Sequence, residues 1–249
     1  MGADLPPPGQ ARVQENITGF WDNHALAYDE HEVSRLHTGL ARDAWAGVWR
    51  SALPTPPADV LEVATGTGQV ALLLAELGYC VTGIDLAEGM LSLARAKGVR
   101  MTNPPGAAVR RRRDPPFPPA SFDAVVSRYL LWTLREPQVA VANWRRLLRP
   151  GGALVAVDGP WFADNMLRDT KGLDSQEREE YLRHYDEQVV ASLPLACATP
   201  VDTFVAIVGE AGFSDVRVTP LPEIERLERE LLADTSEVLL QFMVTARSE

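Results

Sequence analysis

The residues best suited to chemistry are a glycine turn, Thr65-Gly66-Thr67-Gly68, and two carboxylates near it in the sequence. Glu62 lies in the apolar segment that leads into the turn, and Asp85 ends the next apolar segment along the chain. Glycine lets a ligand approach the backbone closely because no Cβ intervenes. A carboxylate at Asp85 can accept hydrogen bonds from both hydroxyls of a ribose. The pattern therefore predicts a binding site for a cofactor that contains adenosine.

Two classes of adenosine cofactor fit this pattern. The spacing Gly66-x-Gly68-x-x-Ala71 matches the dinucleotide-binding fingerprint, and Asp85 follows Gly66 by 19 residues, close to the expected spacing. However, Glu62 would repel a pyrophosphate near the turn and attract an ammonium or sulfonium group. Glu62 therefore favours a cationic cofactor such as S-adenosylmethionine. Taken alone, Glu62 is also consistent with an exposed acid at a strand end.

The segments around the turn alternate between strand and helix patterns. Short apolar runs predict strands at 59–64, 80–85, 107–111, 122–127, 153–158, 216–218 and 239–245. Longer apolar patterns predict helices at 70–77, 87–97, 139–148 and 201–212. This alternation is typical of an α/β fold with a doubly wound, mostly parallel sheet. Ligands of such sheets bind beyond the carboxyl ends of the strands, where the turn lies.

Four segments resemble motifs of the class I, S-adenosylmethionine-dependent methyltransferases, in the order usual for that family. They cover about residues 58–158 and run from Leu61 to Gly68, Gly83 to Leu91, Pro116 to Arg128 and Leu147 to Gly152. Phe20-Trp21-Asp22 and Ala27-Tyr28-Asp29 are similar to the lid of members that act on small molecules. The chain most resembles the natural-product branch of the family.

The resemblance implies a Rossmann-like sheet of seven strands with a final antiparallel strand, an N-terminal helical lid and an inserted cap. Residues 1–10 are expected to be disordered and residues 11–249 to form a single methyltransferase domain. Within this domain we expect the lid at 11–53, the cofactor-binding core at 58–158, the cap at 160–198, and a closing helix and strands at 199–249.

The resemblance also implies which residues bind the cofactor: Tyr28, Glu62, Ala64, Gly66, Gly68, Asp85, Leu86, Met90, Asp114, Ser127 and Arg128. Glu62 would lie near the methionine amino group, and Asp85 would bind the ribose. Leu86 would flank the adenine, and Tyr28 would close over the cofactor from the lid. The two residues that end the fourth strand would lie beside the methionine part and the sulfonium.

Two positions depart from the family pattern. Ala64 stands where the family usually has its first glycine, and because alanine is small we expect it to be tolerated. The family usually has an acid after the third strand that contacts the adenine amino group. In this sequence that position falls near Arg111, which is not an acid. Asp114 is the nearby acid and comes a few residues later. Either Asp114 serves in a shifted loop, or backbone and packing alone hold the adenine.

Methyl transfer requires an acceptor atom placed in line behind an already activated methyl group, which proximity and orientation can largely supply. A general base helps if the acceptor must lose a proton, and histidine suits neutral pH. His31 and His184 are the candidates, although an enzyme without a general base remains open. Aromatic residues are candidates for an apolar acceptor pocket or for ordinary core: Trp21, Trp132, Trp161, Phe162 and Tyr185.

Composition narrows the partners. The formal net charge is −10, so the chain repels a phosphate backbone, and we expect no nucleic-acid substrate. One basic run, Arg110 to Arg113, is more typical of a solvated loop. No segment approaches the roughly 20 apolar residues that cross a membrane, and no spacing typical of a metal site occurs. The two cysteines, Cys80 and Cys197, favour a reducing compartment and thus the cytoplasm.

The sequence therefore predicts transfer of a methyl group from S-adenosylmethionine to an O, N or C nucleophile of a small molecule, in secondary metabolism. Two alternatives stay open. One is a nicotinamide-dependent oxidoreductase, and the other is a protein that binds S-adenosylmethionine without catalysis or uses it differently. The oligomeric state is not predicted.

Overall fold

The computed structural model describes residues 8–36, 39–99, 101, 106–109, 117–160, 175–196, 200–231 and 238–249. In these residues a sheet of seven strands has the order β3-β2-β1-β4-β5-β7-β6. The strands are β1 (Asp59–Val63), β2 (Cys80–Asp85), β3 (Gly106–Val109), β4 (Phe122–Arg128), β5 (Leu148–Asp158), β6 (Phe213–Pro220) and β7 (Phe242–Ser248). Strands β1 to β5 pair in parallel, and β7 runs antiparallel to both β5 and β6. The predicted Rossmann-like fold with a final antiparallel strand is thus confirmed.

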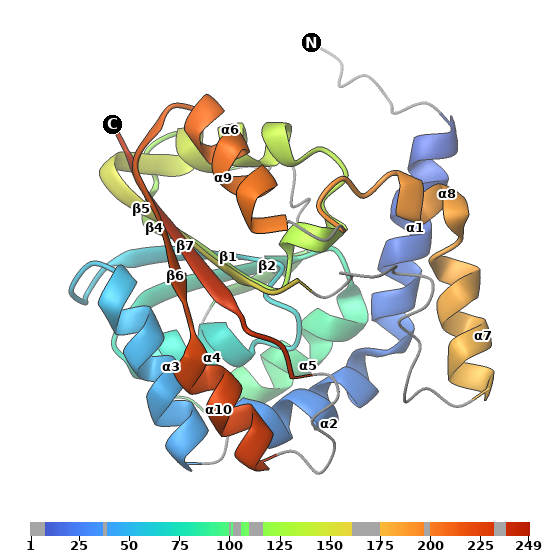
Figure 1. Ribbon diagram of the computed structural model, residues 1–249. Coiled ribbons are helices and arrows are strands. Elements are labelled where there is room, and N and C mark those ends of the chain that lie inside the picture. The colour runs from blue at the N-terminus through green and yellow to red at the C-terminus, as the bar shows by residue number, and fades with distance from the viewer. Residues whose placement is uncertain are drawn as a thin grey trace.

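Helices cover both faces of the sheet (Figure 1). They are α1 (Pro8–Asn23), α2 (Ala25–Leu36), α3 (Gly39–Ala52), α4 (Gln69–Glu76), α5 (Glu88–Gly98), α6 (Pro137–Leu147), α7 (Ser175–His184), α8 (Glu187–Ala191), α9 (Pro200–Glu210) and α10 (Pro222–Leu231), with a 3-10 turn, η1 (Leu131–Thr133). Helices α3, α4 and α10 pack on one face and α6 and α9 on the other. Among the described residues, every helix is too short or too polar to cross a lipid bilayer.

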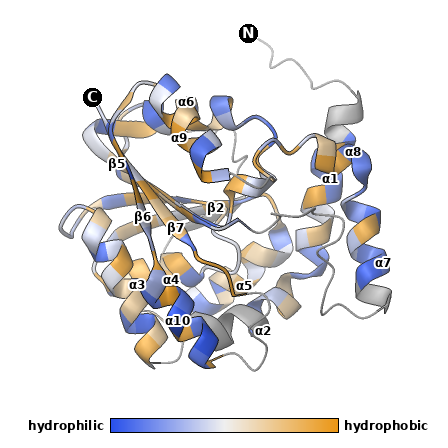
Figure 2. Ribbon diagram, in the orientation of Figure 1, coloured by the Kyte–Doolittle hydropathy of each residue, from blue (hydrophilic) through white to orange (hydrophobic). Residues whose placement is uncertain are grey.

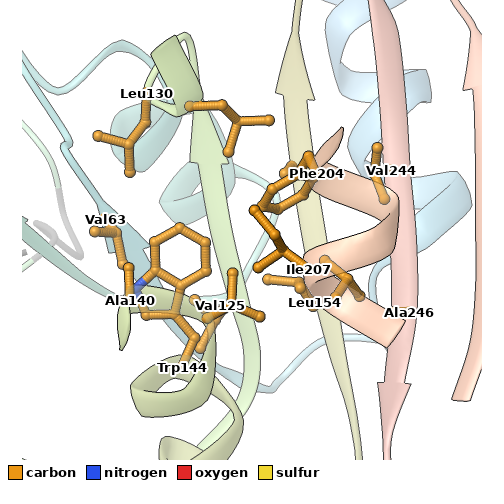
Figure 3. Packing of buried hydrophobic residues seen from close by; sticks show 14 of the residues in the cluster. Val63, Val125, Leu130, Ala140, Trp144, Leu154, Phe204, Ile207, Val244 and Ala246 are labelled. Atoms are coloured by element: carbon orange, nitrogen blue, oxygen red, sulfur yellow. The ribbon is translucent and has the colours of Figure 1, made fainter. Parts of the chain in front are cut away.

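The core under α6 and α9 shows how the sheet is anchored. Trp144 of α6 and Phe204 of α9 are fully buried against strand residues such as Val125 (Figure 3). Each large apolar side chain buried in this way contributes about 2 kcal/mol. A residue of a central strand points to one face and its neighbour to the other, so both faces need apolar partners. This packing fixes the strand ends that carry the site.

The N-terminal helices divide into two groups. Helix α3 is part of the core, because Trp45 and Trp49 are almost completely buried against the sheet and α4. Helices α1 and α2, which we call the lid, lie against α5 at the carboxyl edge of the sheet. Helices α7 and α8, which we call the cap, pack on α1 beside the sheet (Figure 1). The segment expected to form one lid therefore supplies both a core helix and a covering pair.

Several element boundaries differ from the prediction, and one helix was not predicted. Helix α1 begins at Pro8, inside the segment expected to be disordered. Strand β5 begins at Leu148 because the Pro150-Gly151-Gly152 sequence is accommodated as an irregularity within the strand. Helix α10 was not predicted from the sequence. It buries Ile224, Leu227 and Glu228 on a narrow stripe, and its other face is charged (Figure 2).

Candidate cofactor and acceptor site

The glycine turn is a left-handed backbone segment between β1 and α4. Gly66 and Gly68 have φ angles of 54° and 85°, a region that side chains strongly disfavour. A Cβ at Gly68 would lie 2.9 Å from the Cβ of Ala94 on α5, so this position has no room for a side chain. A Cβ at Gly66 would instead lie 3.9 Å from Met90 Sδ and 4.0 Å from Tyr28 Cε1. Gly66 therefore opens toward a space that Met90 and Tyr28 border.

Ala64 shares the left-handed backbone with the two glycines. Its φ is 59°, which costs a non-glycine residue about 1 kcal/mol. This conformation explains why the related family usually has glycine here. The fold tolerates alanine because its side chain ends at Cβ, in agreement with the expectation from its size.

Asp85 is held against the turn by backbone amides. Its Oδ2 accepts a hydrogen bond from Gly66 N at 2.9 Å, and its Oδ1 accepts from Leu86 N at 2.6 Å and Ala87 N at 3.0 Å. The residue is only 7% exposed, yet it lines a pocket at the carboxyl edge of the sheet. A carboxylate has about four lone-pair positions, so Asp85 keeps acceptor capacity for a ligand.

Glu62 lies behind the turn and is not among the residues that line the pocket. It is 2% exposed, and its Oε2 accepts a hydrogen bond from Thr65 Oγ1 at 2.5 Å. Burial raises the pKa of Glu62 to about 8, although the Thr65 hydroxyl and the charge of Arg128 act in the opposite direction. Without a ligand, Glu62 is thus mostly uncharged at neutral pH and is not the exposed acid that the sequence left open.

Arg128 brings a fixed positive charge to the pocket wall. Its guanidinium carbon lies 4.2 Å from the ring centre of Tyr129 and 5.3 Å from that of Trp45. Such stacking orients the planar guanidinium. The preceding residue, Ser127, is 1% exposed, and its Oγ has no hydrogen-bond partner in the described part of the chain. A buried hydroxyl of this kind at a strand end is a candidate ligand contact.

The lid is attached to the core by carboxylates. Asp22 Oδ1 accepts from Gly89 N at the start of α5 at 2.8 Å, and a Cβ at Gly89 would lie 2.5 Å from Asp22 O. Asp29 Oδ1 accepts from Gln69 Nε2 at 2.9 Å and Lys97 Nζ at 2.6 Å. These contacts place Tyr28 directly over the turn.

A pocket that is open to solvent lies between the turn and the lid. It is lined by Thr18, Trp21, Tyr28, Ala64, Gly66, Asp85, Leu86, Ala87, Met90, Arg128, Tyr129 and Thr133. Seven of the predicted cofactor residues are brought together here: Tyr28, Ala64, Gly66, Asp85, Leu86, Met90 and Arg128. Thr18, Tyr129 and Thr133 were not predicted. The last two follow the carboxyl end of β4, and that position was the available signal.

Of the two candidate histidines, His184 is described and does not line this pocket. His184 packs on α1, where its Nε2 would lie 3.7 Å from a Cβ at Gly19. Its Nδ1 is 3.0 Å from Glu180 O in its own helix, α7. The side chain of His31 lies outside the described residues, and so do Asp114, Trp161 and Phe162. Trp132 and Tyr185 join the aromatic packing between α1 and the cap, with ring centres 5.7 Å apart.

Comparison with known proteins agrees with this geometry. Residues 61–156 match the family model described as a methyltransferase domain. A demethylmenaquinone methyltransferase of Tropheryma whipplei is 36% identical over 147 residues, which cover 57% of this chain and 58% of that protein. A demethylmenaquinone methyltransferase of Mycolicibacterium gilvum is 27% identical over 224 residues, covering 78% and 91%. The chain spans 50–58% of the length of the first three curated relatives it matches.

The fold also resembles solved structures of low sequence identity. A geranyl diphosphate C-methyltransferase from Streptomyces coelicolor superposes with a TM-score of 0.65 at 14% identity, and the alignment covers 100% of both chains. At this identity the likeness concerns the fold alone. The match of residues 61–156 to the methyltransferase domain model begins one residue before Glu62 and contains the whole glycine turn.

Proposed function

We propose that the protein transfers the methyl group of S-adenosylmethionine to an O, N or C nucleophile of a small molecule. The observation that carries this proposal is the pocket itself. It joins a left-handed glycine turn, the Asp85 carboxylate and the Arg128 guanidinium under two aromatic lid residues, Trp21 and Tyr28. The cofactor needs contacts of this kind: close backbone approach, acceptors for ribose hydroxyls, and opposite charges for its amino-acid end.

The residues present fit the cofactor. Gly66 leaves open the space next to Met90 and Tyr28 that a side chain would fill. Ser127 Oγ is a buried hydroxyl without a hydrogen-bond partner among the described residues. We assign Asp85 to the ribose, Leu86 and Met90 to the adenine, and Arg128 to the methionine carboxylate. Glu62 acts from behind the turn, where it regains its charge when an ammonium group approaches. The bound cofactor supplies an activated methyl group on a sulfonium.

A dinucleotide fits less well, for reasons other than those drawn from the sequence. Glu62 is mostly uncharged at neutral pH in the free protein, so its repulsion of a pyrophosphate is weaker than the sequence implies. In dinucleotide sites the pyrophosphate binds to the amides of the turn and the helix N-terminus. Here Asp85 already accepts from Gly66 N, and Asp29 lies over Gln69, the first residue of α4. Two carboxylates therefore lie where a pyrophosphate would bind, and both disfavour its binding.

The chain's own residues would orient the acceptor and exclude water. Trp21 and Tyr28 pack edge to face with ring centres 5.5 Å apart and cover the pocket. Thr18, Tyr129 and Thr133 also line the pocket. The hydroxyls of Tyr129 and Thr133 already donate to Gln241 Oε1 and Leu130 O, so they can only accept from a ligand. His184 lies away from the pocket, and we propose that rate enhancement comes mainly from proximity and orientation. An acceptor that requires proton removal would then lose its proton to solvent.

The aromatic lining favours a flat, largely apolar acceptor. The name of one relative is consistent with this choice, since demethylmenaquinone has a flat aromatic head group. We propose a cytoplasmic enzyme of secondary metabolism with a small-molecule acceptor. The net charge of −10 disfavours nucleic acid as a substrate.

Calorimetric titration tests the proposal. S-adenosylhomocysteine, NAD(H) and NADP(H) are titrated in parallel into wild type, Asp85→Asn and the exposed control Asp43→Asn. We expect micromolar binding of S-adenosylhomocysteine alone, at least tenfold weaker in Asp85→Asn and unchanged in Asp43→Asn. Binding of a nicotinamide nucleotide instead would overturn the proposal. Methyl transfer from labelled S-adenosylmethionine to a panel of quinols, phenols and prenyl compounds then separates an enzyme from a protein that only binds the cofactor.

A further inference from the structure

A chain of buried polar side chains connects the pocket with a helix on the outside of the fold. Tyr129, which follows β4 and lines the pocket, donates a hydrogen bond from its hydroxyl to Gln241 Oε1 at 2.8 Å. Gln241 Nε2 in turn lies 3.1 Å from both carboxylate oxygens of Glu228 on α10. Gln241 is 0% exposed and Glu228 is 4% exposed. None of these three residues was selected by the sequence.

The backbone of Tyr129 indicates that this chain is more than incidental packing. Its φ is 56°, a left-handed conformation that bulky residues rarely adopt. Its amide donates to Val157 O at 2.9 Å, which fixes the backbone at the end of the strand. Strained residues of this type persist only where their surroundings hold them, and they concentrate at functional sites.

Glu228 determines which way the chain of hydrogen bonds runs. The Gln241 amide turns its NH₂ toward both Glu228 oxygens and its oxygen toward Tyr129. The Tyr129 hydroxyl is then the donor. Hydrogen bonds in a buried site of low dielectric are stronger than the same bonds in water. The orientation of the Tyr129 ring is thus set from α10.

The ring of Tyr129 carries this constraint to Arg128. The guanidinium carbon lies 4.2 Å from the Tyr129 ring centre, and Trp45 lies on another side at 5.3 Å. We propose that Tyr129, Gln241 and Glu228 are positioning residues that hold the Arg128 guanidinium ready for the carboxylate end of the cofactor. The proposal rests on the proposed function for the identity of that ligand, but the hold on Arg128 exists in the free protein.

A double-mutant cycle tests the coupling. Glu228→Gln keeps the shape of the side chain but no longer fixes the Gln241 amide, and Tyr129→Phe keeps the ring but removes the hydroxyl. Glu230→Gln, which removes an exposed acid from the same helix, is the matched control. We expect Glu228→Gln and Tyr129→Phe each to weaken S-adenosylhomocysteine binding by about threefold to tenfold. The double variant should be no weaker than the worse single variant, and the control should bind like wild type.

Two further readouts separate positioning from mere stability. The Arg128 Nε–Hε signal in nitrogen-15 NMR spectra of the free protein, assigned through Arg128→Lys, should broaden or exchange faster in both single variants. If the variants only lower the melting temperature and leave that signal and the binding constant unchanged, the proposal is wrong. If wild type binds no S-adenosylhomocysteine, the proposed function fails, whereas a changed Arg128 signal would still support the hold on the guanidinium.

Discussion

The glycine turn and the lid border the same pocket, and the cap packs on the lid, but different forces hold the turn and these helices. The turn is built from backbone constraints within residues 62–85: left-handed glycines, an Asp85 carboxylate on three amides, and β1 paired with β2. The lid and cap are built from aromatic packing and surface ion pairs between distant segments. Arg12 and Asp186, which join α1 to the cap, are 174 residues apart in the sequence.

The difference separates what is fixed from what can vary. Backbone geometry accepts few side chains, so the turn tolerates little change in sequence. Aromatic packing between helices accepts many side chains of similar volume. The cap packs on α1, so its sequence can change more freely than that of the turn. Four substitutions or measurements test this contrast, beginning with the largest expected effect.

Gly68→Ala should break the turn. Alanine would adopt a left-handed φ and place its Cβ 2.9 Å from Ala94 Cβ, so we expect the free energy of unfolding to fall by about 3 kcal/mol. Urea unfolding measures the loss. Gly151→Ala is the matched control, because Gly151 has a φ of 77° with nothing within 4 Å of its Cβ, and should cost only about 1 kcal/mol. Equal losses would show that backbone strain, rather than the close approach to α5, dominates.

Glu62 should make cofactor binding depend on pH. Its pKa of about 8 in the free protein means that it is mostly protonated at neutral pH. A bound ammonium favours the ionised form and lowers this pKa, so binding releases a proton below pH 8. Affinity for S-adenosylhomocysteine should therefore rise with pH, by at most about tenfold per unit, and level off above pH 8.

The control for this pH effect is Glu62→Gln, which cannot ionise. Calorimetry at pH 6, 7 and 8 in buffers of different ionisation enthalpy should find proton release for wild type and none for the variant. The free energy of unfolding should respond to pH in the opposite direction from the affinity. Because the raised pKa favours the protonated native form, wild type should lose stability relative to Glu62→Gln as pH rises toward 8. A wild-type affinity that does not change with pH would contradict the assignment.

Asp29→Asn should loosen the lid and leave the turn intact. The substitution removes the charge that pairs with Lys97 and keeps one acceptor for Gln69. Partly buried contacts of this kind contribute about 1 kcal/mol. We expect faster hydrogen exchange in α2 and faster dissociation of S-adenosylhomocysteine, with exchange in β1 and β2 unchanged. Asp43→Asn, on the exposed side of α3, should change neither, and slower exchange in α2 would count against the lid.

Ala64→Gly is expected to have the smallest effect. Glycine relieves the left-handed strain but adds freedom to the unfolded chain, so the free energy of unfolding should rise by about 0.5 kcal/mol or less. Cofactor affinity should stay within twofold. A large change in affinity would mean that the Ala64 methyl contacts the ligand, which would extend side-chain control into the turn.

The sequence was most informative where structure is local. Gly66, Gly68 and Asp85 were predicted from spacing because the turn and its carboxylate lie on consecutive strands of a parallel pair. Arg128 was reached by resemblance at the end of β4. The fold followed from the alternation of strands and helices. These features depend on residues close in the sequence or on short motifs.

The remaining features depend on contacts between distant residues. Tyr129 and Gln241 are 112 residues apart, and a single buried amide leaves no periodic signal. His184 was expected near the acceptor because it lies in the cap, but α7 turns it toward Gly19 of α1. Helix α10 was missed although Ile224, Leu227 and Leu231 recur at helical spacing, and nothing in that pattern marks Glu228 as buried. That same residue begins the polar chain that ends at Arg128.

Strand β7 sits between β5 and β6, although β6 precedes it in the sequence. During synthesis on the ribosome, β6 therefore has no partner until Phe242 and the residues after it have emerged. The five parallel strands with the glycine turn can assemble earlier. Gln241 immediately precedes β7, so it reaches its place when β7 pairs with the sheet. It then forms hydrogen bonds with Tyr129 and with Glu228 of α10. Closing the sheet is thus also the step that brings Gln241 to Tyr129, the contact through which we propose that Arg128 is positioned.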